Sequence, residues 1–122
     1  MKSYVLTILR RKLMSHEKYR SCIEACNRCA DACDHCSTAC LKESNVAQME
    51  RCIRLDIDCA ALCRFAAAAM ARGSEYASDI CRLCAELCDA CGEECGKHEA
   101  NHCQECAQAC RDCAEACRTM AA

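Results

Sequence analysis

The chain has 122 residues, a formal charge of −2 and 19 cysteines, with no proline, no tryptophan and one phenylalanine. This length predicts a single domain with one core, and the near-neutral charge provides no broad basic surface for nucleic acid. The absence of proline and the abundance of alanine, glutamate, arginine and leucine favour helix throughout, so we expect an all-α fold.

Residues 1–14 form an apolar and basic segment, separate from a main domain over residues 15–122. Within the segment Val5, Leu9 and Leu13 are spaced four apart, which is typical of a short helix that lies across the domain or contacts another subunit. Its apolar run is too short for a signal peptide. We therefore expect a cytoplasmic protein with no membrane partner, and in that reducing compartment many cysteines indicate metal binding before disulfides.

The cysteines fall into four groups, and nearly all steps within a group are three or four residues. Such steps repeat the a and d positions of a heptad and place each group along one seam of a helix. The sequence predicts one helix for each group, over about residues 16–41, 46–71, 75–95 and 99–120. The groups, in chain order, are Cys22, Cys26, Cys29, Cys33, Cys36 and Cys40, then Cys52, Cys59 and Cys63, then Cys81, Cys84, Cys88, Cys91 and Cys95, and finally Cys103, Cys106, Cys110, Cys113 and Cys117.

Local signals agree with these helix boundaries. Ser15 is a candidate cap for the first helix, and Asn45 with Gln48 resembles a capping box at the start of the second. Gly73 and Ser74 predict a helix end followed by a new cap. Because the connections are short, neighbouring helices should be antiparallel, and we expect an up-down-up-down four-helix bundle with a cysteine-lined core.

The second predicted helix differs from the others because it carries only three cysteines and a further apolar set. This set is formed by Ile53, Leu55, Ile57 and Leu62. Two interpretations are open: the set supplements the core of its own bundle, or it packs against another subunit.

Nineteen cysteines on inward-facing seams are too many to serve only as small hydrophobic residues, because leucine or valine would build a more stable core. Soft thiolates suit Cu(I), Zn(II) and iron–sulfur clusters. A Zn(II) site with four cysteines carries a charge of −2, and several such sites in a narrow bundle would be costly to bury, whereas one Cu(I) per thiolate is neutral. We predict storage and buffering of many Cu(I) ions, with a zinc or iron–sulfur carrier and a thiol redox reservoir as the alternatives.

Three further residues are candidate metal ligands. Asp56 occupies a slot in the second seam where a thiol is expected, and a buried carboxylate there needs either a metal or hydrogen-bond donors. His98 and His102 continue the three-four register beyond the third group. They fall at the mouth, which is the end of the bundle where the first and third connections meet. There they would either pass Cu(I) inward or remain solvated.

The opposite end of the predicted bundle collects most of the aromatic residues. Tyr19, Phe65 and Tyr76 gather there with Met70 and Met120, and we expect them to form a plug. The sequence contains no set of nucleophile, base and oxyanion donors, so we expect no enzymatic activity.

Four antiparallel helices, a cysteine-lined interior and the lack of an export signal resemble the cytosolic members of the bacterial copper storage proteins. The resemblance covers about residues 15–122 and all four cysteine groups. It implies bulk storage of Cu(I) inside a four-helix bundle, little backbone rearrangement on loading and assembly of bundles into a homotetramer. A copper chaperone is a candidate partner.

Overall fold

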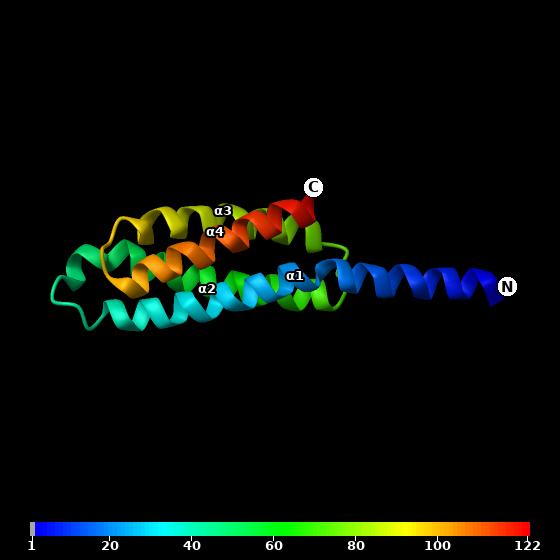
Figure 1. Cartoon of the computed structure of the whole chain (residues 1–122), viewed down its shortest axis with the longest axis horizontal. Coiled ribbons are helices and arrows are strands. Elements are labelled where there is room, and N and C mark those ends of the chain that lie inside the picture. The colour runs from blue at the N-terminus through cyan, green and yellow to red at the C-terminus, as the bar shows by residue number, and fades with distance from the viewer. Residues whose placement is uncertain (1) are drawn as a thin grey trace.

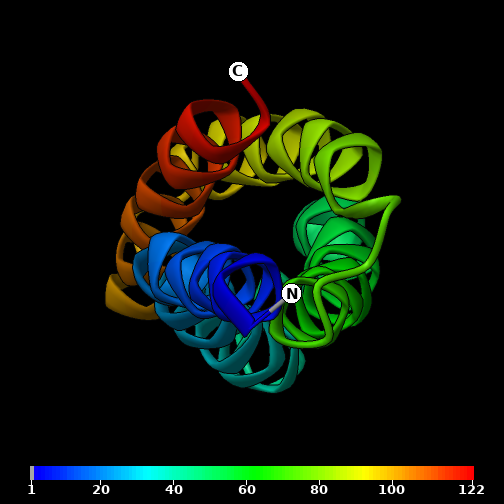
Figure 2. The same cartoon turned by 90° about the vertical axis from the view of Figure 1, so that its right-hand side faces the viewer.

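A computed structural model describes residues 2–122, with side chains for Glu17 and for residues 19–122. This part of the chain forms four α-helices and one short 3-10 helix and contains no strand. Each α-helix runs antiparallel to its neighbour in sequence, and the four surround a common axis (Figures 1 and 2). The predicted all-α, up-down-up-down bundle is confirmed. Its elements are α1 (Lys2–Cys40), η1 (Val46–Met49), α2 (Glu50–Ala71), α3 (Ala77–Gly96) and α4 (Asn101–Ala121).

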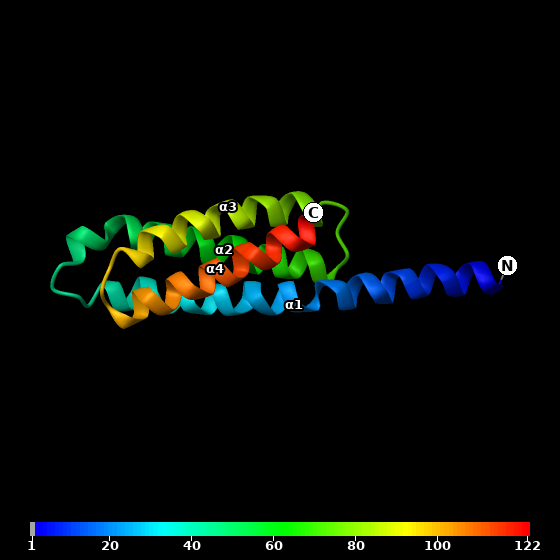
Figure 3. The ribbon, with the colours of Figure 1, turned by 45° about the horizontal axis from the view of Figure 1, so that its top comes forward.

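Helix α1 is longer than the sequence signals suggested. It begins at Lys2 and passes through Ser15 without a break, so the predicted cap at Ser15 is corrected. No proline or glycine occurs between Lys2 and Cys40, so nothing ends the helix once it has started. The first turns of α1 extend well beyond the ends of the other three helices (Figures 1 and 3).

The connection between α1 and α2 corrects the predicted capping box. The Asn45 side-chain amide donates a hydrogen bond to Gln48 Oε1 at 3.4 Å, and the Gln48 backbone N–H donates to the Asn45 carbonyl at 3.0 Å. Neither side chain caps a backbone group of the following helix. The chain therefore enters α2 through a 3-10 turn, which satisfies its first backbone groups in a tighter geometry.

Gly73 ends α2 as predicted, in the left-handed backbone region with φ of 65°. Its N–H donates to the Met70 carbonyl at 3.0 Å, and the N–H of Ser74 donates to the Ala69 carbonyl at 2.9 Å. These two bonds form a Schellman motif, which glycine allows at no steric cost. The Ser74 hydroxyl then accepts a hydrogen bond from the Tyr76 N–H at 3.1 Å, one residue before α3 begins.

The core consists of sulfur and small side chains. All 19 cysteines are buried, together with alanines from each helix and three methionines. Small residues let the helices approach closely: a Cβ added to Gly92 of α3 would lie 3.2 Å from Cys110 Cβ and 3.4 Å from the Ala107 carbonyl oxygen of α4. A bundle without large hydrophobic residues thus keeps its thiols within contact distance of one another.

The apolar set of α2 is divided between two environments. Ile53, Leu55 and Leu62 are partly buried and pack against the core of their own bundle. Ile57 is 55% exposed on the outer surface. The first interpretation therefore holds for three residues of the set, and packing against another subunit stays a prediction for Ile57.

Candidate metal centre

The four seams bring thiols from every helix to the bundle axis. Cys29 of α1 illustrates the arrangement, because its Sγ lies 3.8 Å from Cys59 Sγ of α2, 4.0 Å from Cys88 Sγ of α3 and 3.7 Å from Cys110 Sγ of α4. Heptad spacing keeps each seam inward over several turns, so this pattern repeats along the bundle. The result is a core in which sulfurs are the nearest neighbours of other sulfurs.

The thiols form overlapping groups of four whose sulfurs all lie within 4.8 Å of one another. Several cysteines belong to two such groups, among them Cys29, Cys33, Cys110 and Cys113. A thiolate that bridges two soft metal ions needs this kind of shared position. The all-cysteine groups include Cys26, Cys84, Cys113 and Cys117; Cys29, Cys63, Cys88 and Cys113; Cys29, Cys33, Cys59 and Cys110; and Cys33, Cys91, Cys106 and Cys110.

Asp56 lies inside this core and is fully buried. Its Oδ1 accepts hydrogen bonds from the thiols of Cys91 at 3.2 Å, Cys95 at 3.3 Å and Cys106 at 3.2 Å, while the Cys52 thiol lies 3.8 Å from Oδ2. Burial raises the pKa of Asp56 to about 8, with help from neighbouring thiols. The predicted need for partners is met by sulfur donors on α2, α3 and α4.

At the mouth, His102 joins the thiols. Its Nδ1 lies 3.5 Å from Cys36 Sγ, 3.8 Å from Cys40 Sγ and 3.5 Å from Cys103 Sγ, so that one nitrogen and three sulfurs form a mixed group. Its other ring nitrogen, Nε2, lies 2.9 Å from Glu43 Oε1. His102 is the predicted histidine that the structure brings to the thiols.

His98 is held differently. Its Nε2 lies 3.0 Å from Glu94 Oε2, and it makes no hydrogen bond to sulfur among the described side chains. Glu94 also pairs with Arg51 at 2.9 Å and with Lys97 at 3.7 Å. Burial alone would raise the pKa of Glu94, but the hydrogen bonds from Arg51 and His98 outweigh it and hold the pKa below its usual value. His98 thus belongs to an ion-pair network that links α2 to α3.

The two histidines face a polar hollow at the surface of the mouth. The hollow has a volume of about 620 Å³ and is lined by Glu43, Met49, His98 and His102 among others. Beneath it, burial raises the pKa of Cys40 to about 11. Burial also raises the pKa of Cys103 above its usual value. These thiols are therefore protonated at neutral pH, and a metal that binds them must displace protons.

The opposite end only partly matches the predicted plug. Met70 and Met120 are buried there, and Tyr19 packs against the core. Phe65 and Tyr76, by contrast, are 52% and 62% exposed, so their predicted place in the plug is wrong. Phe65 falls between inward-facing positions of α2, and Tyr76 precedes the first turn of α3, so neither side chain reaches the axis.

The two carboxylates that hold the mouth histidines were not predicted from the sequence. Glu94 lies in the last turn of α3 and His98 follows the end of that helix by two residues, so their four-residue spacing could have indicated the pair. Glu43 lies in a loop, 59 residues from His102, and no periodic signal relates the two. The meeting of these two residues depends on how the first and third connections come together.

Comparisons with known proteins agree with this geometry. The family model described as copper storage protein matches residues 15–122. The Cu(I)-bound copper storage protein BsCsp3 of Bacillus subtilis is 53% identical, with a TM-score of 0.83 over 86% of this chain and 99% of that one. A cytosolic copper storage protein from Streptomyces lividans loaded with five coppers is 42% identical, with a TM-score of 0.84 over 88% of this chain and 95% of that one.

A curated relative also matches part of the chain. The uncharacterized cysteine-rich protein YhjQ of Bacillus subtilis is 54% identical over 71 residues, which are 57% of this chain and 66% of that protein. The chain thus spans just under two thirds of the length of this relative. The matched family and its solved members are storage proteins rather than enzymes. Residues 1–14 lie outside the family match.

Proposed function

Because the chain belongs to the copper storage protein family, we propose that it stores and buffers many Cu(I) ions through the cysteine thiolates inside its bundle. The observation that carries this proposal is the sharing of thiols between neighbouring groups of four. Isolated metal sites need separate ligand sets, whereas a chain of bridged Cu(I) ions needs sulfurs that belong to two sites at once. All 19 cysteines are assigned as ligands.

Charge balance supports Cu(I) over the competing metals. Each Cu(I) neutralises one thiolate, so a filled core stays close to neutral, while stacked Zn(II) sites with four thiolates each would accumulate negative charge in a buried space. The capacity expected from this balance is about one ion per cysteine. Ions that bind Cys40 and Cys103 would displace protons, because burial raises the pKa of both thiols.

We expect loading to need no refolding of the bundle, because the heptad spacing of each helix by itself directs its thiols inward. All 19 cysteines are buried in the core that the four helices form. Ions would enter at the mouth, where His102 and three thiols lie beneath the polar hollow. His98, which the sequence also predicts as a ligand, would first have to leave Glu94.

Asp56 has a different place in the proposed core. With three thiols around Oδ1 at 3.2–3.3 Å, its carboxyl group lies where a metal bound to Cys91, Cys95 or Cys106 would sit. We assign it as an oxygen ligand or hydrogen-bond acceptor in the half of the core nearer the mouth. As a metal ligand it would lose its proton and supply one negative charge in place of a thiolate.

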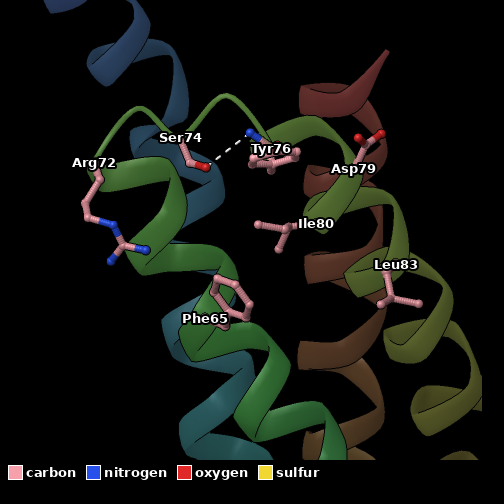
Figure 4. Close-up of a pocket in the computed structure, with 7 residues that line it drawn as sticks. All are labelled: Phe65, Arg72, Ser74, Tyr76, Asp79, Ile80 and Leu83. Atoms are coloured by element: carbon pink, nitrogen blue, oxygen red, sulfur yellow. Dashed lines mark hydrogen bonds between the residues drawn. The ribbon is translucent and has the colours of Figure 1, made fainter.

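We also propose that bundles self-associate through the outer faces of α2 and α3, with a homotetramer as the assembly that the family resemblance implies. Phe65 on α2 flanks an apolar groove of about 520 Å³ with Ile80 and Leu83 on α3 (Figure 4). Leu83 is 55% exposed, and Ile57 of α2 is also exposed. A second copy of the bundle offers a matching apolar surface, as a symmetric interface requires.

A cytoplasmic location is proposed as well, since many free thiols persist best in a reducing compartment. The Streptomyces relative is named as cytosolic. None of the described helices is long and apolar enough to span a bilayer. A copper chaperone remains the candidate donor, with the mouth as its docking end.

The deciding experiment is an anaerobic titration of the reduced apo-protein with Cu(I) against a chromophoric chelator, followed by far-UV circular dichroism. We expect about one ion per cysteine and full helicity before metal is added. Replacing the five cysteines of α4 by alanine should lower the capacity by about five ions, on the same basis of one ion per thiolate. Saturation of the unmodified protein at a few ions would refute storage and favour the zinc, iron–sulfur or redox alternatives.

A further inference from the structure

We propose that Glu43 is a positioning residue for copper uptake, because its carboxylate holds the His102 ring with Nδ1 turned toward the thiols of the mouth. This inference rests on the proposed storage function. It assigns a role to a loop residue outside the cysteine seams, and it predicts which of the two mouth histidines receives the incoming ion.

The two nitrogens of His102 have different partners. Nε2 lies 2.9 Å from Glu43 Oε1, and Nδ1 lies 3.5 Å from both Cys36 Sγ and Cys103 Sγ. A carboxylate can only accept a hydrogen bond, so Nε2 must carry the proton of this contact. In the neutral ring Nδ1 is then left with its lone pair, which is the form that binds a metal.

The local fold fixes Glu43 in relation to the thiols. Glu43 follows the end of α1 by three residues, and its backbone N–H donates to the Cys40 carbonyl at 3.2 Å. This turn places the carboxylate directly beyond the last thiol of the first seam. His102 is the second residue of α4, and its side chain is only 14% exposed, so the ring is enclosed between the seam and the carboxylate.

The second histidine of the mouth provides an internal comparison. His98 also has a glutamate partner, Glu94, but that carboxylate is shared with Arg51 and Lys97, and His98 makes no hydrogen bond to sulfur among the described side chains. In His102, by contrast, one ring nitrogen contacts the Glu43 carboxylate and the other contacts the sulfurs of Cys36 and Cys103. Carboxylates that orient a metal-binding histidine in this way typically change affinity or activity about 10–100-fold when removed.

The test combines two variants with a matched control. Glu43→Ala removes the acceptor, Glu43→Gln keeps an oxygen that can accept from Nε2, and Glu50→Ala removes an exposed carboxylate at the same end that contacts Arg54 rather than a histidine. In the apo-protein, nitrogen NMR should show His102 protonated at Nε2. Glu43→Ala should lose this preference, while Glu43→Gln and Glu50→Ala should keep it.

Copper uptake is then followed by stopped flow with limiting Cu(I). We expect Glu43→Ala to load about 10-fold more slowly and to reach the same final capacity, with Glu43→Gln close to the unmodified protein. In a His102→Ala background, Glu43→Ala should have no further effect. A ring protonated at Nδ1 in the unmodified protein, or uptake by Glu43→Ala at the unmodified rate, would overturn the inference. Failure of every variant, and of the unmodified protein, to bind copper would refute the storage function instead, while the NMR result still decides the ring orientation.

Discussion

Cys52 Sγ of α2 lies 3.1 Å from Cys95 Sγ of α3, the shortest sulfur–sulfur contact among the described thiols. The contact lies near the mouth and joins two helices that are antiparallel neighbours in the bundle. Both side chains are fully buried, so their reactivity depends on the short distance between the two sulfurs.

Mild oxidation of the apo-protein should therefore link Cys52 to Cys95 before other pairs. Attack of one sulfur on another needs contact distance, and this pair is closer than any other described pair of thiols. Peptide mapping by mass spectrometry after limited oxidation identifies the first disulfide, and Cu(I) capacity should fall by about two ions for two thiolates lost. Cys52→Ala should abolish this early product. A first disulfide deep in the core would contradict the prediction.

The buried carboxyl group of Asp56 should make the apo-protein less stable as pH rises. Its pKa is raised to about 8 in the folded protein, above the unfolded value of 3.8. Between these values the folded state holds a proton that the unfolded state has lost, so the free energy of unfolding falls with increasing pH. The loss should reach the order of a few kcal/mol by pH 8.

Urea unfolding of Asp56→Asn under reducing conditions provides the comparison. The variant lacks the titrating group, so between pH 5 and pH 8 it should lose less stability than the unmodified protein. Parallel pH profiles for the two proteins would show that the carboxyl group is not desolvated as the structure indicates.

Copper binding should release protons and become tighter as pH rises. Burial raises the pKa of Cys40 to about 11, and raises that of Cys103 as well, so these thiols carry protons at pH 7. A pH-stat titration should record protons released as Cu(I) is added. Loading with no proton release would mean that the thiols are already ionised in the empty core.

Two glycines of α3 should respond to alanine in opposite directions. A Cβ at Gly92 would meet Cys110 Cβ at 3.2 Å and the Ala107 carbonyl at 3.4 Å, whereas at Gly96 the nearest atom is Ala107 Cβ at 3.9 Å. Gly92→Ala should push α3 from α4 and destabilise the apo-protein by about 1–2 kcal/mol. Gly96→Ala should be neutral or stabilise it by up to about 1 kcal/mol. Urea midpoints of the two variants give the sign of each effect, and equal shifts would contradict the close helix approach.

The sequence predicted the core well because heptad spacing is a local signal. Cys29, Cys59, Cys88 and Cys110 meet at the axis because each falls on an inward position of its own helix. What could not be predicted depends on contacts between distant segments. The Glu43–His102 pair is one example, since the loop after α1 must first be brought to the start of α4.

Helix ends were less predictable for a related reason. Ser15 has the chemistry of a cap, yet the preceding residues also favour helix, and nothing in the local sequence forces a stop. Phe65 was placed in the plug because of its residue type and its distance along α2. Its angular position on the helix instead places it in the outer groove.

The two ends of the bundle are not equivalent, and this asymmetry would determine the order in which the proposed copper store fills and empties. Met70 and Met120 are buried at one end, while His102 and the polar hollow lie at the other. In the proposed store, ions that enter and leave at the hollow would be released in the reverse of the order in which they arrived. Copper held near Cys117 would thus be a long-term reserve, and copper near Cys40 would exchange first with the cell.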